Sequence, residues 1–166
     1  MHASELKGRA VLTLSDAAKL GQVDDVLFDP EFRRVLGFRI KKGLLSHSEA
    51  LPRDRVQAVG ADALTVPGPD AINEEGRYPE LSGAKGLADV HGTRVVTESG
   101  TLVGTVHELE IDDLAQTVLT YTLQGSLLDK LRGDQAAIDP DEVLRLGEGG
   151  IMIVKDAAAQ RLTSNA

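Results

Sequence analysis

Residues 20–29 read Leu-Gly-Gln-Val-Asp-Asp-Val-Leu-Phe-Asp, and a similar order of residue types returns at 104–112 as Gly-Thr-Val-His-Glu-Leu-Glu-Ile-Asp. Placing Gly21 on Gly104 gives an offset of 83 residues, since 104 − 21 = 83. Self-similarity at a nearly constant offset indicates an internal repeat, and a repeat determines how the whole chain folds.

The blocks on either side of this stretch also repeat, in the same order. They are residues 8–15 over 92–99, 35–40 over 118–123, 51–56 over 138–143, and Gly60, Leu64 and Val66 over Gly147, Ile151 and Ile153. One block could match by chance, but blocks that keep their order from end to end indicate two copies of one small domain.

Alternating residues in both copies predict β-strands. In the first copy Leu36, Phe38 and Ile40 are expected to face a core, and Gly37, Arg39 and Lys41 to face outward. In the second, Leu119, Tyr121 and Leu123 alternate with Thr120, Thr122 and Gln124. A period of two fits a half-buried strand and no helical stripe. Short strands separated by turns every 8–12 residues favour an all-β barrel or sandwich.

Each copy is expected to end with a proline, a short helical turn, a glycine and a last strand. The helical turns are expected at 54–59 and 141–146, with Asp139 as the cap and Pro140 at the first position. The predicted organisation is a first repeat at 1–68, a linker at 69–86, a second repeat at 87–157, and a tail at 158–166 that forms a short helix or stays loose.

This pattern resembles the PRC-barrel family. The residues that carry the resemblance are Leu20–Asp29, the ending Leu51-Pro52…Val56…Gly60, and Gly133…Ile138…Val143…Gly147 in the second copy. The resemblance implies two small PRC-like β-barrels in tandem, mainly β, of six or so strands each, that bind other macromolecules. The family includes the cytoplasmic part of the photosynthetic reaction-centre H subunit and a domain of a bacterial ribosome-maturation factor. These glycines and apolar positions describe a fold and not a chemistry.

Composition excludes several classes of site and of protein. The chain has no cysteine, which excludes disulfides and thiolate chemistry and favours a reducing compartment. No apolar run approaches the roughly 20 residues that span a bilayer, and no apolar signal core stands at the N-terminus. A soluble, cytoplasmic protein is therefore expected.

The chemistry-bearing residues form no recognisable catalytic or metal-binding motif. The four histidines have no metal-ligand spacing, and Ser46, His47 and Ser48 are expected to form a polar loop. The carboxylate pairs Asp24-Asp25 and Asp112-Asp113 are expected to be solvated or bonded to backbone amides. We expect no catalytic residue, no metal, no cofactor and no enzymatic activity.

A charge difference between the copies gives the candidate interaction face. It consists of Arg33, Arg34, Arg39, Lys41 and Lys42. Their counterparts are Gln116, Thr117, Thr122, Gln124 and Gly125, so the second copy keeps the core positions and loses these cations. The alternative is an edge strand that cations protect against aggregation.

Three functions remain open on this basis. The first is a non-enzymatic adaptor that docks onto a larger protein complex. The second is an RNA-linked role in ribosome maturation or RNA processing, which the net charge of −8 and the 3% of aromatic residues disfavour. The third is a small-molecule-binding protein or enzyme with a site at the seam of the two barrels. The partner, and whether the chain forms homo-oligomers, stay open.

Overall fold

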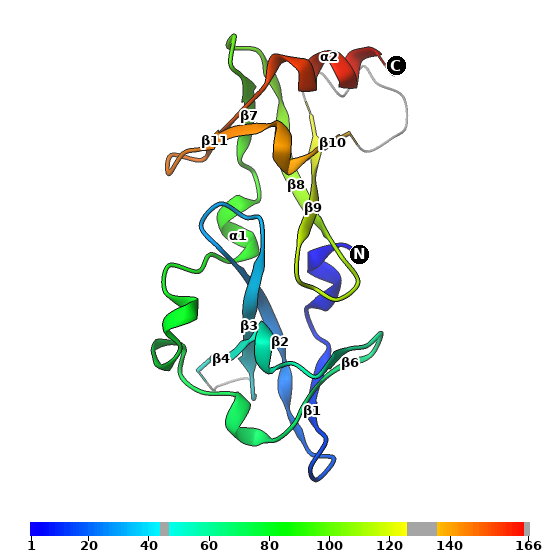
Figure 1. Cartoon of the computed structure of the whole chain (residues 1–166), viewed down its shortest axis with the longest axis vertical. Helices are drawn as coiled ribbons and strands as arrows, with labels where there is room; N and C mark the ends of the chain where they lie inside the picture. Colours follow the sequence, from blue (N-terminus) through cyan, green and yellow to red (C-terminus); the bar gives the residue numbers. More distant parts are fainter. Residues whose placement is uncertain (44–46, 126–135, 165–166) are drawn as a thin grey trace. The chain divides into compact units, whose positions relative to one another are not determined.

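The computed structural model describes residues 1–43, 47–125 and 136–164, and the chain divides into two compact units. Unit 1 comprises Met1–Leu87 together with Ile111–Thr117, and unit 2 comprises Ala88–Glu110 together with Val118–Ala166. Each unit contains one six-stranded sheet (Figure 1). The structure confirms the predicted all-β class with two small tandem barrels. Ser46 and Gly133, which the sequence singled out, lie outside the described residues.

Unit 1 holds the first sheet and several single turns of 3₁₀-helix. Its strands are β1 (Ala10–Thr13), β2 (Lys19–Phe28), β3 (Val35–Lys41), β4 (Glu49–Pro52), β5 (Ala58–Val59) and β6 (Ala63–Val66). Its 3₁₀-turns are η1 (Ala3–Leu6), η2 (Arg53–Arg55), η3 (Pro69–Ala71), η4 (Glu75–Arg77) and η5 (Pro79–Leu81).

Unit 2 repeats this layout and adds a C-terminal helix. The short helix α1 (Leu87–Val90) spans the boundary between the two units. The later elements are β7 (Arg94–Thr97), β8 (Leu102–Ile111), β9 (Val118–Gln124), β10 (Ala137–Ile138), η7 (Pro140–Glu142), β11 (Val143–Leu146), β12 (Ile151–Val154) and α2 (Asp156–Ser164).

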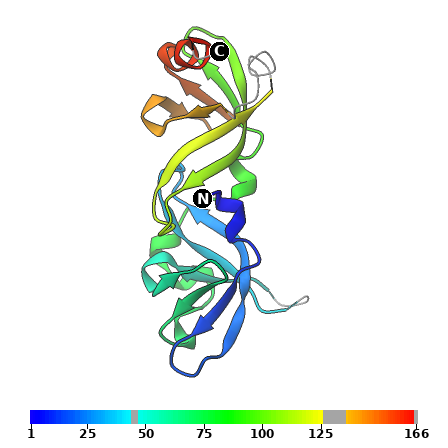
Figure 2. The same cartoon turned by 90° about the vertical axis from the view of Figure 1, so that its right-hand side faces the viewer.

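The two sheets have the same topology, which confirms the repeat. Their strand orders are β4-β3-β2-β1-β6-β5 and β10-β9-β8-β7-β12-β11, and the β1–β6 and β7–β12 pairs are parallel. Figures 1 and 2 show the long strands of each sheet twisting strongly. Right-handed twist lets a short sheet curl round its own apolar face.

Apolar side chains from each sheet fill its interior, mostly as the alternation predicts. In unit 1 the fully buried residues include Val11, Val26, Phe28, Phe38, Ile40, Leu51, Leu64 and Val66. In unit 2 they include Val95, Val106, Leu109, Tyr121, Ile138, Met152 and Val154. With so few aromatic residues, aliphatic side chains supply most of both cores.

The helical turns near the end of each copy are shorter than predicted. Only Arg53–Arg55 and Pro140–Glu142 are helical, and the residues that follow form the strands β5 and β11. Asp139 caps the second turn as expected: its side chain accepts from the Asp141 amide at 2.9 Å, and its own amide donates to Glu142 Oε1 at 2.9 Å. The prediction of helix to 59 and 146 is wrong because valine and leucine here pair in a hairpin.

The predicted alignment of the last strands is off by one residue. The amide of Gly60 donates to Ala63 O, whereas the amide of Gly147 donates to Ile151 O, so the second turn is one residue longer. Ile151 is therefore the counterpart of Ala63. The buried pair Leu64 and Val66 corresponds to Met152 and Val154, and not to Ile151 and Ile153.

A β-bulge changes the orientation of one predicted core residue. Leu27 pairs with Gly37 while Phe28 pairs with Val35, which leaves Leu36 without a partner in the ladder. Leu36 is half-buried against a separate apolar cluster of Leu27, Ala50, Tyr78 and Leu81. The prediction that Leu36 and its counterpart Leu119 face the barrel core is wrong, and Leu119 is 46% exposed.

The segment expected as a linker packs on the sheet of unit 1. We call residues 71–85 the strap. Ala50 and Asn73 exchange backbone hydrogen bonds at 2.7 and 3.1 Å near one end, and Phe28 and Lys85 do so at 2.8 and 2.9 Å at the other. Between these fixed points Tyr78 and Leu81 are buried. Sheet residues predicted to face solvent are therefore covered here.

Candidate functional site

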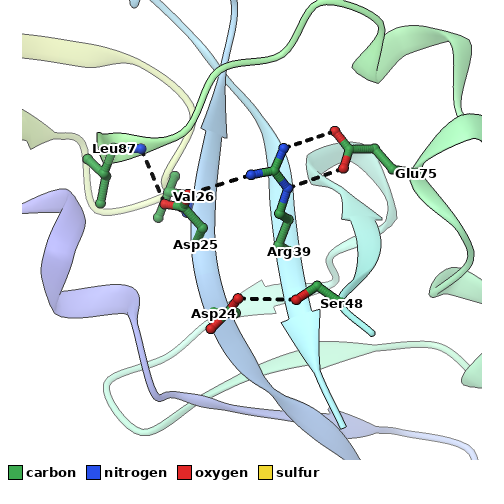
Figure 3. A network of polar contacts seen from close by, with 7 residues as sticks. All are labelled: Asp24, Asp25, Val26, Arg39, Ser48, Glu75 and Leu87. Atoms are coloured by element: carbon green, nitrogen blue, oxygen red, sulfur yellow. Dashed lines mark hydrogen bonds and ion pairs between the residues drawn. The ribbon is translucent and has the colours of Figure 1, made fainter. Parts of the chain in front are cut away.

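Arg39 belongs to a network that holds the strap to the sheet (Figure 3). Its Nε lies 3.2 Å from Glu75 Oε2, and its Nη1 lies 3.8 Å from Asp25 Oδ2. Asp25 Oδ1 also accepts from the amides of Val26 at 2.8 Å and Leu87 at 3.2 Å. Arg39 is thus shared between two carboxylates of unit 1, and its side chain is 35% exposed.

Glycines allow the close packing around this network. A Cβ on Gly86 would clash with Asp25 Oδ2. A Cβ on Gly37 would lie 2.5 Å from Leu51 O and 3.2 Å from Leu81 Cδ2. Because β3 lies between β2 and β4, it is not an edge strand, and the edge-protection alternative is wrong.

Lys41 and Lys42 lie at another place, at the far end of β3. They line a shallow hollow of about 300 Å³ together with Lys19, Gly21, Gln22 and Gly43. Lys42 Nζ lies 3.1 Å from Glu49 Oε2. The five predicted face residues therefore occupy three separate environments.

Arg33 and Arg34 lie on the turn between β2 and β3, which Asp29 holds closed. Asp29 Oδ1 accepts from the amide of Arg33 at 2.8 Å and from that of Arg34 at 2.6 Å. Phe32 has a φ of 54°, in the left-handed region, which costs a non-glycine residue about 1–2 kcal/mol. Its buried ring packs on Phe28 with 5.4 Å between centroids, and this burial offsets the strain.

The turn at 111–117, also part of unit 1, repeats this geometry. Asp112 Oδ1 accepts from the amides of Gln116 at 2.6 Å and Thr117 at 3.2 Å, and Ala115 has a φ of 52°. The Val35 amide donates to Gln116 O at 2.9 Å. An isolated antiparallel bridge between Arg34 and Thr117 joins the two turns.

The side chain of Arg53, at the start of η2, holds the second turn by binding the backbone of that turn. Its Nε and Nη2 donate to Leu114 O at 2.9 and 2.6 Å. Burial lowers the pKa of the Arg53 guanidinium from its ordinary value, and the Asp112 carboxylate opposes this shift. The guanidinium remains charged, because arginine side chains stay protonated in proteins.

These elements enclose a groove of about 730 Å³ in unit 1. Its lining residues are Arg33, Arg34, Val35, Leu36, Arg53, Asp54, Glu80, Gln116 and Thr117. The groove combines apolar surface, guanidinium groups, two carboxylates and the polar side chains of the second turn. The sequence predicts Arg33 and Arg34 as part of a site but does not predict Arg53 or the turn at 116–117, because nothing in it indicates that turns 83 residues apart pair.

The other chemistry-bearing residues that the sequence singled out have structural partners or lie exposed. Ser48 Oγ donates to Asp24 Oδ2 at 3.1 Å, and His47 is exposed. His91 and His107 in unit 2 lie with ring centroids 5.8 Å apart, a proximity that their sequence spacing does not indicate. No cluster of three or more metal-ligating side chains occurs among the described residues.

Comparison with known proteins identifies the family. The profile of the PRC-barrel domain matches residues 1–72 and 83–160. The chain belongs to the PRC-barrel family. The two matches cover both repeats, so this PRC-barrel protein carries the domain twice. No curated protein matches it significantly.

One solved structure similar to this PRC-barrel protein is described as a putative 16S ribosomal RNA processing protein RimM from Pseudomonas aeruginosa. The two chains are 15% identical, the match covers 92% of this chain and 97% of that one, and the TM-score is 0.33. Among the described residues, no helix has the length and apolar character needed to cross a membrane.

Proposed function

We propose that this PRC-barrel protein is a non-enzymatic interaction module that docks onto a larger protein complex through the groove of unit 1. The observation that carries the proposal is the position of Arg33 and Arg34. Asp29 fixes their backbone in the lining of the groove, and the hydrogen bond from the Val35 amide to Gln116 O holds the second turn beside the first. A pre-organised groove binds with less loss of conformational entropy than a flexible one.

The chemistry of the lining favours an extended protein segment with carboxylates. Arginines recognise carboxylates through paired N–H donors, and Val35 and Leu36 offer apolar contact. Asp54 and Glu80 on the same lining repel a continuous phosphate backbone but accept from a partner's amides or cations. The net charge of −8 also disfavours nucleic acid.

The absence of enzymatic activity is part of the proposal. Asp25, Asp29 and Asp112 are engaged by backbone amides, and Asp24 by Ser48. Carboxylates used in this way fix turns and strands, which supports a structural role for them.

A charge-reversal experiment tests the docking. Tagged wild-type protein, the variant Arg33→Glu with Arg34→Glu, and the control Lys41→Glu with Lys42→Glu are purified from the native host at low and high salt. One protein species is expected to co-purify in stoichiometric amount with wild type and control. With the groove variant its recovered amount is expected to fall about tenfold, which corresponds to a loss of about 1.4 kcal/mol of binding free energy.

Other outcomes contradict the proposal in identifiable ways. Loss of the partner with the lysine control and not with the groove variant would place docking elsewhere. Recovery of RNA that dissociates steeply with salt, without a protein species, would favour the RNA-linked function instead.

A further inference from the structure

An apolar row crosses the outer face of the sheet in unit 2. The strand registers place Leu102 opposite Val96, and Val96 opposite Ile153. Ile151 lies in the neighbouring row, opposite Arg94. The intervening residues Val95, Met152 and Val154 are fully buried, so this set faces away from the core. Leu102 is 37% exposed and Ile151 is 41% exposed.

The barrel does not require large apolar residues at three of these four positions. The same registers in unit 1 place Lys19 opposite Leu12, and Leu12 opposite Thr65, with Ala63 as the counterpart of Ile151. Lysine, threonine and alanine thus stand where unit 2 has leucine and two isoleucines. Since one copy folds with the polar set, the apolar set is not needed to form the sheet.

Two arginines lie beside Ile151 and Ile153 on the strands next to β12, in the half of the chain that is otherwise acidic. Arg94 lies on β7 beside Ile151, and Arg145 lies on β11 opposite Ile153. Both side chains are exposed. Residues 71–166 carry 8 Lys+Arg and 16 Asp+Glu, so these cations run against the local charge balance. Apolar side chains with cations beside them complement a surface that presents apolar side chains and carboxylates.

We propose that the patch formed by Val96, Leu102, Ile151 and Ile153, with Arg94 and Arg145 beside its two isoleucines, binds an acidic, apolar segment of a partner protein. We call these six residues the second-sheet patch. All of them lie in unit 2, and none lines the groove. This site is therefore additional to the proposed docking groove, and the failure of one does not imply the failure of the other.

Methyl NMR of the full chain with two synthetic peptides tests the proposal. One soluble peptide alternates leucine with glutamate, and its match alternates leucine with lysine. The expected result is saturable shifts of the Ile151, Ile153 and Leu102 methyl resonances with the glutamate peptide, and at least tenfold weaker binding of the lysine peptide.

Variants in which residues of unit 2 are replaced by their counterparts from unit 1 test whether the patch itself binds the peptide. Leu102→Lys with Ile153→Thr introduces the corresponding residues of unit 1, and it is expected to weaken binding of the glutamate peptide to the patch at least tenfold. Leu119→Thr removes another exposed leucine of unit 2 and is expected to leave the peptide-induced shifts of the patch methyls unchanged. The groove variant Arg33→Glu with Arg34→Glu is expected to leave the same patch shifts unchanged. If the first variant does not fold by circular dichroism, Arg94→Glu with Arg145→Glu replaces it, and its expected result is a reversed peptide preference.

Several results would overturn the proposal. They are equal affinity for both peptides, unchanged affinity in the patch variants, and shifts confined to the groove. Concentration-dependent shifts of the patch methyls without peptide would also overturn it, because they would identify a second copy of this chain as the occupant.

Discussion

Replacing Asp29 with alanine removes the group that holds the β2–β3 turn in shape. Its carboxylate accepts from the Arg33 and Arg34 amides at 2.8 and 2.6 Å, and from the Glu31 amide at 3.3 Å. An aspartate that caps backbone amides contributes about 0.5–2 kcal/mol relative to alanine. Because Asp29 accepts two short hydrogen bonds, its contribution should lie at the upper end of this range. We expect the free energy of unfolding to fall by about 2 kcal/mol, which is roughly 30-fold in the unfolding equilibrium.

The two tyrosines make this loss measurable unit by unit. Tyr78 lies in unit 1 and Tyr121 in unit 2, and the chain has no other tyrosine. Urea unfolding followed by the ring NMR signals therefore reports each unit separately. The midpoint of the Tyr78 transition is expected to fall, and Asp29→Asn, which keeps one acceptor oxygen, is expected to recover about half of the loss.

A matched control separates the cap from a general effect of removing an acid. Asp24 lies at a bulge of β2, is exposed, and contacts Ser48. Its replacement by alanine should change the free energy of unfolding by less than about 0.5 kcal/mol. If Asp29→Ala also changes the Tyr78 transition by less than that, the reasoning about the turn is refuted.

Three further predictions concern stability and pH. Tyr78→Phe removes the hydroxyl that donates to Ala71 O at 2.6 Å, and it should cost about 1 kcal/mol by urea unfolding and speed amide exchange in the strap; unchanged exchange would contradict the role of this bond. Asp139→Ala removes a capping box in unit 2 and should cost about 1 kcal/mol, and a loss confined to unit 1 would argue against it. Hydrogen bonds from Thr13 and, to a smaller extent, Ser15 lower the pKa of Asp16. The stability that ionised Asp16 contributes is therefore present above its unfolded pKa and is lost as the pH falls through the lower folded pKa. Thr13→Val should raise the pKa of Asp16 in an NMR titration, and an unchanged pKa would contradict the role of Thr13.

The repeat and the barrel class could be predicted from sequence because both depend on residue order and a period of two. The buried Phe38 and Tyr121 follow directly from the alternation. Leu36 does not, because a bulge adds one residue to β3 and the pattern does not show where. A glycine-rich turn with one more residue likewise shifted the alignment of Ile151 by one position.

The strap could not be predicted because its buried residues have no period. Tyr78 and Leu81 lie among prolines, glycines and charged residues in the sequence. They are buried only because they pack against the sheet. The alternation of β3 likewise predicts that Arg39 points outward into solvent. In the structure Glu75 of the strap forms an ion pair with it. The groove depends on two turns 83 residues apart in sequence, and no local signal joins them.

Photo-crosslinking from inside the groove tests the central claim most directly. A photoreactive amino acid replaces Gln116, which is exposed and lines the groove, or Ala157, which is exposed on α2 and serves as the control. The account predicts that Gln116 captures one protein in living cells, through a segment rich in Asp and Glu, and that Arg33→Glu with Arg34→Glu abolishes this product. Capture at Ala157 alone, or a Gln116 product that survives the double charge reversal, would contradict docking through the groove.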